Sequence, residues 1–153
     1  MEKLNSYLTF KLGNETFAAN VANVLHILGI PEITKMPNSP DYVMGVMNMR
    51  GQVLPVIDPH PHFNIGQQEI TKDSCIVVLE ISNEDERFQL GSLVDSVQEV
   101  VEISEDKILP APELGAEYNS KYIEGVIQHG DKFILILNTV QVFSELGSGI
   151  TNL

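Results

Sequence analysis

Residues 42–48 read Tyr-Val-Met-Gly-Val-Met-Asn, and residues 122–128 read Tyr-Ile-Glu-Gly-Val-Ile-Gln. The two stretches stay in step as far as Asp58 in the first copy and Asn138 in the second. In each copy a glycine, two apolar residues and an amide are followed by a turn, an apolar run and then Asp or Asn. A repeat of this length in a chain of 153 residues predicts two copies of one small structural unit.

The rest of the chain predicts short strands separated by turns. Apolar runs place strands at 7–12, 15–19, 43–49, 53–58, 74–81, 87–94, 122–128 and 132–137. Tight turns are expected at Gly13-Asn14, Arg50-Gly51 and Gly130-Asp131. Helical spacing of apolar residues predicts a short helix over 20–28, and Asn138 is expected to cap a second helix over 139–146. Many short strands with regular turns are typical of an all-β fold of two small five-stranded barrels, related by internal duplication with a pseudo-twofold axis.

We expect one domain over residues 1–153. The first barrel is predicted at 15–80. The second is predicted at 81–146 together with the N-terminal strand 6–13, and residues 147–153 are expected to form a tail.

Composition excludes several classes of function. Nine basic and 21 acidic residues give a net charge of −12, which repels nucleic acid and anionic lipid. The N-terminus lacks the apolar stretch of a signal peptide, and no apolar run is long enough to span a membrane. We therefore expect a cytoplasmic protein that binds no nucleic acid and does not insert into the membrane.

One segment raises the possibility of metal chemistry. Asp58, His60 and His62 alternate, which on a strand would place three metal ligands on one face. A small metal-dependent enzyme is therefore an alternative function. Against it, Pro59 and Pro61 favour a polyproline-like path that would break the shared face.

Residues 48–58, Asn-Met-Arg-Gly-Gln-Val-Leu-Pro-Val-Ile-Asp, resemble the NLRGxVxPVxD signature of the CheW family, the coupling proteins of bacterial chemotaxis. Residues 8–13, 37–40, 93–100, 110–113 and 122–125 resemble further blocks of that family, in the same order. The resemblance covers roughly residues 6–146.

This resemblance implies a non-enzymatic adaptor with two similar five-stranded barrels and no cofactor. Such proteins bind the regulatory domain of the histidine kinase CheA and the cytoplasmic tip of chemoreceptors, and they join ring-like arrays, so weak self-association is also expected. The positions that match receptor-facing ones are Val24, Gly45, Arg50, Val97 and Val100. Kinase contacts are expected around Leu25 and Leu28.

Each of these residues also has a purely structural interpretation. The valines can be core residues, Gly45 can be required by the backbone, and Arg50 can be a solvated turn residue. The chain also departs from the family pattern at residues 59–62, where Pro-His-Pro-His replaces a segment that is usually basic. A coupling protein of a twitching-motility or other non-flagellar chemosensory pathway is therefore an alternative to a chemotaxis protein.

Overall fold

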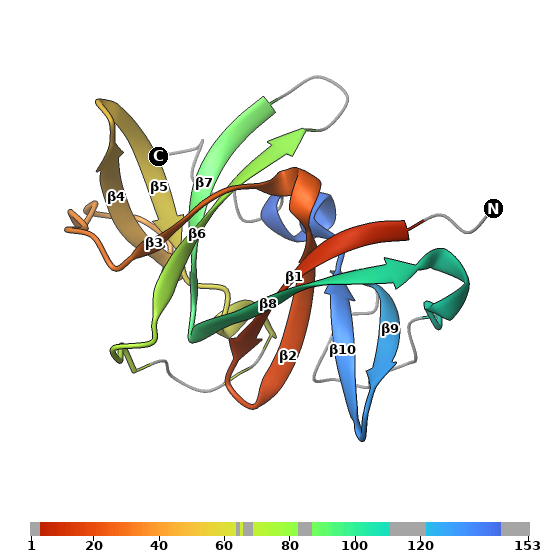
Figure 1. The fold of residues 1–153 in the computed structure, drawn as a ribbon. Helices are drawn as coiled ribbons and strands as arrows, with labels where there is room; N and C mark the ends of the chain where they lie inside the picture. Colours follow the sequence, from red (N-terminus) through yellow and green to blue (C-terminus); the bar gives the residue numbers. More distant parts are fainter. Residues whose placement is uncertain (1–3, 64, 66–68, 83–86, 111–121, 145–153) are drawn as a thin grey trace.

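Strands make up most of the computed structural model, which describes residues 4–63, 65, 69–82, 87–110 and 122–144 (Figure 1). The strands are β1 (Leu4–Leu12), β2 (Glu15–Asn20), β3 (Val24–Gly29), β4 (Val43–Met49), β5 (Gln52–Ile57), β6 (Cys75–Ser82), β7 (Arg87–Val94), β8 (Ser96–Ser104), β9 (Ile123–His129) and β10 (Lys132–Leu137). Single 3-10 turns lie at η1 (Val21–Asn23), η2 (Pro61–Phe63) and η3 (Glu105–Lys107), and residues 139–144 are helical.

The strands form two five-stranded sheets, which confirms the predicted all-β architecture. Unit A has the order β8-β1-β2-β10-β9, and unit B has the order β3-β6-β7-β5-β4. One antiparallel bridge, Thr34 to Val46, brings the chain that leaves β3 back beside β4 in unit B. The bridge from Leu109 to Val126 does the same between the end of β8 and β9 in unit A.

The two repeats exchange hairpins, which the predicted barrel boundaries miss. Strands β1–β5 form one repeat and β6–β10 the other, but the β1–β2 hairpin pairs in the sheet that holds β8, β9 and β10. The β6–β7 hairpin pairs reciprocally with β3, β4 and β5. Strand 15–19, predicted in the first barrel, therefore lies in unit A, and strand 87–94, predicted in the second, lies in unit B. Two residues join β1 to β2, and four residues separate β6 from β7. With such short connections each hairpin stays in one sheet, and the chain changes unit only after the second strand.

Strand pairing follows the pseudo-twofold relation closely. Each unit has one parallel pair, β2 with β10 in unit A and β7 with β5 in unit B. Each also has an irregularity where its crossover strand, β8 or β3, begins to pair. Aligning these registers makes Val24 the counterpart of Val97, and Ile27 the counterpart of Val100. The duplication read from residues 42–58 and 122–138 therefore extends over the whole pattern of strands.

The repeated glycine is required by the bridges. A Cβ on Gly45 would lie 2.1 Å from the carbonyl oxygen of Thr34, and φ of Gly45 is +145°. A Cβ on Gly125 would lie 2.4 Å from Cγ2 of Ile108 and 3.0 Å from the carbonyl oxygen of Leu109. In both units the connecting chain crosses directly over β4 or β9, so a side chain has no room there.

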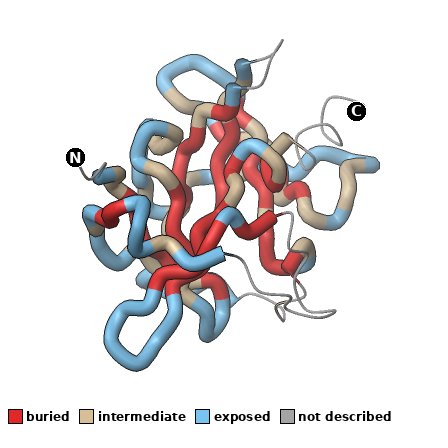
Figure 2. Tube along the Cα trace, turned by 90° about the vertical axis from the view of Figure 1, so that its right-hand side faces the viewer, coloured by how far each residue is buried: buried red, intermediate tan, exposed pale blue. Residues whose placement is uncertain are grey.

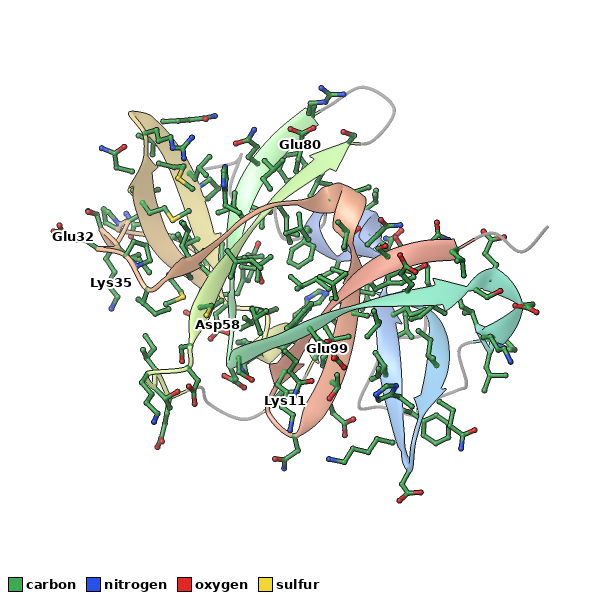
Figure 3. The ribbon with its side chains drawn as sticks, in the orientation of Figure 1. Lys11, Glu32, Lys35, Asp58, Glu80 and Glu99 are labelled. Atoms are coloured by element: carbon green, nitrogen blue, oxygen red, sulfur yellow. The ribbon has the colours of Figure 1, made fainter. Side chains whose placement is uncertain are left out.

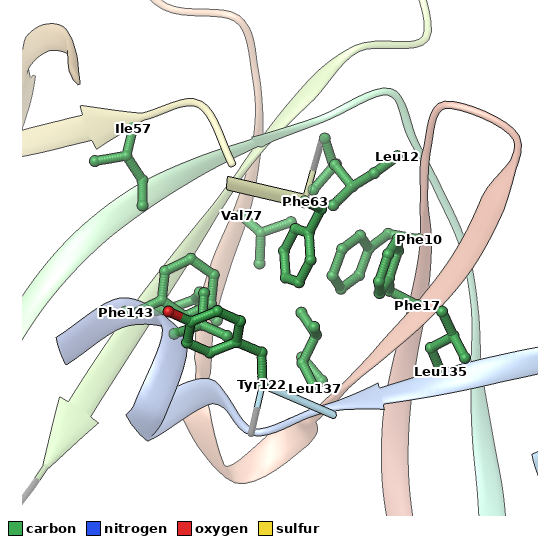
Figure 4. Packing of buried hydrophobic residues seen from close by; sticks show 14 of the residues in the cluster. Phe10, Leu12, Phe17, Ile57, Phe63, Val77, Tyr122, Leu135, Leu137 and Phe143 are labelled. Atoms are coloured by element: carbon green, nitrogen blue, oxygen red, sulfur yellow. The ribbon is translucent and has the colours of Figure 1, made fainter. Parts of the chain in front are cut away.

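The largest apolar cluster lies between the two units. Phe17, which is fully buried, packs its ring 6.2 Å from Phe10 and 5.2 Å from Phe63, measured between ring centroids. Tyr122 and Phe143 contribute from the C-terminal part of the chain (Figure 4). Figure 2 shows how burial is distributed, with buried strands at the centre and exposed loops around them. Smaller clusters fill each unit separately.

The predicted helix over 20–28 is wrong, because residues 21–23 form a 3-10 turn and residues 24–29 form β3. Valine, leucine and isoleucine in this segment suit a strand equally well, and pairing with β6 decides between the two. The predicted Asn138 cap is confirmed: its side chain accepts a hydrogen bond from the Gln141 amide at 3.1 Å. The end of that helix and the tail lie outside the described residues.

Candidate interaction surface

The crossover strands β3 and β8 each carry exposed apolar side chains. Ile27 is 45% exposed and Val100 is 58% exposed, and the two residues occupy equivalent positions in their units. Leu25 on β3 is 39% exposed. Both strands run across the same side of the molecule in Figure 1. This side of the molecule is therefore the candidate surface for contact with another protein.

The three predicted receptor-facing valines differ in how far they are exposed. Each is half-buried and packs against the cluster between the units. Val100 points outward and is the most exposed of the three predicted receptor-facing valines. Of the three valines, Val100 therefore exposes the most apolar area, whereas Val24 and Val97 also contact the core.

The two predicted kinase-facing leucines differ in the same way. Leu25 is exposed, whereas Leu28 is half-buried and packs against the cluster inside unit B. The side chain of Leu25 is thus open to solvent, and that of Leu28 faces the interior of unit B.

Arg50 lies at the tip of the β4–β5 hairpin, at the outer end of unit B and away from β8 in Figure 1. Met49 pairs with Gln52, so Arg50 and Gly51 form a two-residue turn. Both have positive φ, +53° and +86°, as a type I′ turn requires. The Asn48 side chain accepts a hydrogen bond from the Gly51 amide at 2.7 Å. The guanidinium of Arg50 makes no ion pair with the described residues and is exposed.

A shallow groove lies beside this hairpin. Its volume is about 400 Å³, and its lining includes Pro31, Thr34, Val46, Asn48 and Val53. Val53 is 69% exposed. Gly45 lies on β4, next to Val46 of the groove lining, and a Cβ there would lie 2.1 Å from the Thr34 carbonyl oxygen.

The predicted metal-ligand face is wrong. Residues 61–63 form a 3-10 turn, so Asp58, His60 and His62 do not share a strand face. Both ring nitrogens of His60 face carboxylates, and the His62 ring packs 4.5 Å from that of Tyr122, between centroids. No group of three or more His, Cys, Asp or Glu side chains in the described part of the chain is arranged to hold a metal ion.

His60 is instead the centre of a buried charged cluster. The ring is 2% exposed, Nδ1 lies 2.5 Å from Oδ1 of Asp58, and Nε2 lies 3.1 Å from both carboxylate oxygens of Asp95. Desolvation lowers the pKa of His60, but the hydrogen bonds and charges of Asp58 and Asp95 outweigh it and raise the pKa above its ordinary value. Sequence analysis missed Asp95 because it lies 35 positions from His60.

Sequence analysis also missed Ile27. The strand registers make it the counterpart of Val100, an equivalence that the expected helix over 20–28 concealed. Among the helices of the described residues, none has the length and apolar character needed to cross a membrane.

Comparisons with known proteins agree with one another. The model of the CheW-like domain family matches residues 6–147. The chain is 30% identical over 141 residues to the probable chemotaxis protein CheW of Rhizobium etli, covering 92% of this chain and 88% of the relative. It is 31% identical over 139 residues to the chemotaxis protein CheW of Klebsiella aerogenes, covering 91% and 81%. The crystal structure of the scaffolding protein TtCheW from Thermoanaerobacter tengcongensis is similar, with a TM-score of 0.81 and 31% identity over 92% of this chain and 88% of that one.

Proposed function

Because the chain belongs to the CheW-like domain family, we propose that it is a non-enzymatic adaptor that couples chemoreceptors to a CheA-type histidine kinase. The adaptor would hold the kinase regulatory domain on one surface and the receptor tip on another, so that rearrangement of the receptor changes kinase activity. The observation that carries this proposal is the repeated exposure of Ile27 and Val100 on the two crossover strands.

The proposed receptor surface is built around β8. Val100 supplies exposed apolar area, and Val24 and Val97 hold the two crossover strands against the core. An amphipathic helix that lays its apolar face on such a surface buries side chains spaced three or four positions apart. Leu25 is the proposed kinase contact, and Leu28 supports β3 by packing inside unit B.

Arg50 and Gly45 are assigned to a separate part of the proposed interface. The planar guanidinium can donate to a carboxylate or to a carbonyl oxygen on a partner, in a geometry that lysine does not reproduce. The adjoining groove leaves room for a partner side chain. Gly45 acts through the backbone, since it holds the wall of that groove in place.

Calorimetric titration tests the receptor surface. A soluble fragment of the receptor tip is titrated with the wild-type protein, with Val100→Glu and with Arg50→Glu. We expect each substitution to weaken binding by at least tenfold, because hot-spot residues contribute 2 kcal/mol or more. Leu4→Glu is the matched control, because Leu4 has the same exposed fraction as Val100, 58%, at the far end of the neighbouring strand β1.

Circular dichroism separates lost binding from lost folding. Arg50→Glu is expected to keep the wild-type spectrum and cooperative unfolding, because the guanidinium is exposed. Unfolding of that variant, or equal affinity in Val100→Glu and wild type, contradicts the assignment of the surface.

A second titration, against the regulatory domains of the CheA-like kinases encoded in the same genome, identifies the pathway. Saturable binding to a chemotaxis kinase supports the proposal as stated. Binding to the kinase of a twitching-motility or other non-flagellar system selects the alternative instead.

A further inference from the structure

The cluster around His60 joins segments from both units. Asp58 follows β5 in unit B, and Asp95 lies where the chain crosses from β7 in unit B to β8 in unit A. Oδ2 of Asp95 also accepts a hydrogen bond from the Gly13 amide at 2.5 Å, in the β1–β2 turn of unit A. His60 therefore holds the exit of β5 to the crossover and, through Asp95, to the opposite unit. Asp58 lies in the middle of the molecule in Figure 3.

Geometry fixes the protonation state of this ring. An ionised carboxylate accepts hydrogen bonds and donates none, and both nitrogens of His60 face such groups. A neutral imidazole has one N–H, so its second nitrogen would direct a lone pair at a carboxylate. Only the doubly protonated ring satisfies both partners, and it leaves the cluster with one net negative charge.

The opposite crossover has an uncharged version of the same link. Asn23 lies between β2 and β3, and its amide donates to the carbonyl oxygen of Glu80 at 3.3 Å. The Thr139 hydroxyl donates to Oδ1 of Asn23 at 3.1 Å. Register makes Glu80 the counterpart of Lys11, whose carbonyl oxygen accepts from the Asp95 amide. The labelled Glu80 and Lys11 accordingly lie on opposite sides of the centre in Figure 3. None of the side chains in this second link titrates near neutral pH.

We propose that His60 is a pH-dependent latch, which fastens one of the two crossovers between the units while the equivalent crossover is fastened independently of pH. Loss of the ring proton would remove one of its two links and loosen the corner at Asp95. That corner is directly followed by β8, so the latch sets the position of the strand that carries Val97 and Val100. Its effect on partner binding rests on the proposed function, whereas the latch itself does not.

The other titratable groups around the cluster do not change the direction in which the pKa of His60 is shifted. They are Lys11 and Glu15, which flank the β1–β2 turn, His62 in η2, and Tyr42, whose carbonyl oxygen accepts from the Asp58 amide. The charges that act on the pKa of His60 are those of Asp58 and Asp95, and both raise it.

Stability must then depend on pH with a definite sign. Because the pKa of His60 is higher in the folded than in the unfolded chain, the latch contributes its full stability below the unfolded value of about 6.5. That contribution is lost as pH rises through the folded pKa. Between the two values, the unfolding equilibrium constant increases by up to tenfold for each pH unit.

Urea unfolding of the full chain between pH 5.5 and 9 tests the latch. We expect wild type to lose more stability over this range than His60→Gln, which cannot donate to both carboxylates. Asn23→Ala, at the opposite crossover, is expected to be less stable than wild type by the same factor at every pH. Equal pH dependence in wild type and His60→Gln overturns the proposal.

A nuclear magnetic resonance titration of the wild-type protein needs neither a variant nor a partner. With ¹⁵N-labelled histidine, the His60 ring is expected to carry two N–H groups at pH 6 and to lose one at a midpoint above 6.5. A ring with one N–H at pH 6 overturns the proposal. If His60→Gln does not fold, Asp95→Asn replaces it, and its His60 midpoint is expected to be lower than that of wild type.

Discussion

Arg50 occupies a backbone conformation that is unfavourable for its side chain. Its φ of +53° lies in the left-handed region, where an L-residue other than glycine is disfavoured by about 1–2 kcal/mol. The equivalent hairpin between β9 and β10 has Gly130 at φ +64° as its first turn residue. One repeat thus places glycine where the other tolerates an arginine. Strain that is retained at an exposed position supports a role for the side chain in contact with a partner.

This strain predicts the effect of a substitution on stability. Arg50→Gly is expected to raise the free energy of unfolding by about 1 kcal/mol, because glycine adopts positive φ without a steric cost. Arg50→Ala is the control, since it removes the same charge but keeps the strained backbone. Urea unfolding at pH 7 measures both. Equal stabilisation by alanine and glycine would mean that charge, and not backbone strain, is the cause.

The cluster around His60 could not be predicted from the identities of its residues alone. The Pro-His-Pro-His segment indicates a stiff loop, and nothing local to it points to Asp95 at the crossover between β7 and β8. The two carboxylates, whose effect outweighs that of burial, raise the pKa of His60 and make the ring a structural residue instead of a metal ligand. Arg50 and the turn around it, by contrast, follow directly from the residues next to them.

Elements whose structure depends on short-range signals were predicted well. The hairpin turns at Gly13, Arg50 and Gly130 and the cap at Asn138 are fixed by residues within a few positions of each other. The segment 20–28 was predicted wrongly, because its apolar spacing fits a helix while its β-branched residues fit a strand. Its partner β6 lies about fifty residues further along the chain, and pairing with it decides the outcome.

The two bridge glycines predict unequal costs for the same substitution. A Cβ on Gly45 meets the Thr34 backbone at 2.1 Å, at a φ of +145°, so neither the side chain nor the connecting strand can yield easily. A Cβ on Gly125 meets Cγ2 of Ile108 first, a side-chain atom that a change of χ1 would move, and the Leu109 carbonyl oxygen lies further away, at 3.0 Å. We expect Gly45→Ala to cost at least about 3 kcal/mol of unfolding free energy, and Gly125→Ala less, in line with overpacking and strain in other proteins.

Thermal and urea unfolding of the two variants, measured side by side, test this difference. Gly51→Ala provides a further comparison, because its positive φ is strained but a Cβ there has nothing within 4 Å. It is expected to cost the least of the three. A Gly125 variant less stable than the Gly45 variant would mean that the bridge in unit A is the more rigid one.

Over the whole molecule, the exchange of hairpins makes the two repeats depend on each other. Neither repeat contains a complete sheet, because unit A takes β1 and β2 from one repeat and β8, β9 and β10 from the other. The largest apolar cluster lies between the units and includes Phe17 and Phe63 from the first repeat and Val77 and Tyr122 from the second. The duplication could be read from the sequence, but the exchange could not, since identical local patterns fit either pairing.

This interdependence predicts the behaviour of fragments cut in the exposed loop after Ile70. Residues 1–70 alone lack partners for the β1–β2 hairpin and for β3, and residues 71–153 lack partners for the β6–β7 hairpin and for β8. An isolated hairpin is marginally stable in water, so each fragment alone is expected to be unfolded by circular dichroism. Mixed in equal amounts, the two are expected to regain the spectrum of the intact chain, with a midpoint of unfolding that depends on concentration, as for any assembly of two chains. Cooperative unfolding of either fragment by itself would mean that a repeat can close its own sheet, and the exchange would then be one of two accessible pairings instead of a requirement of the fold.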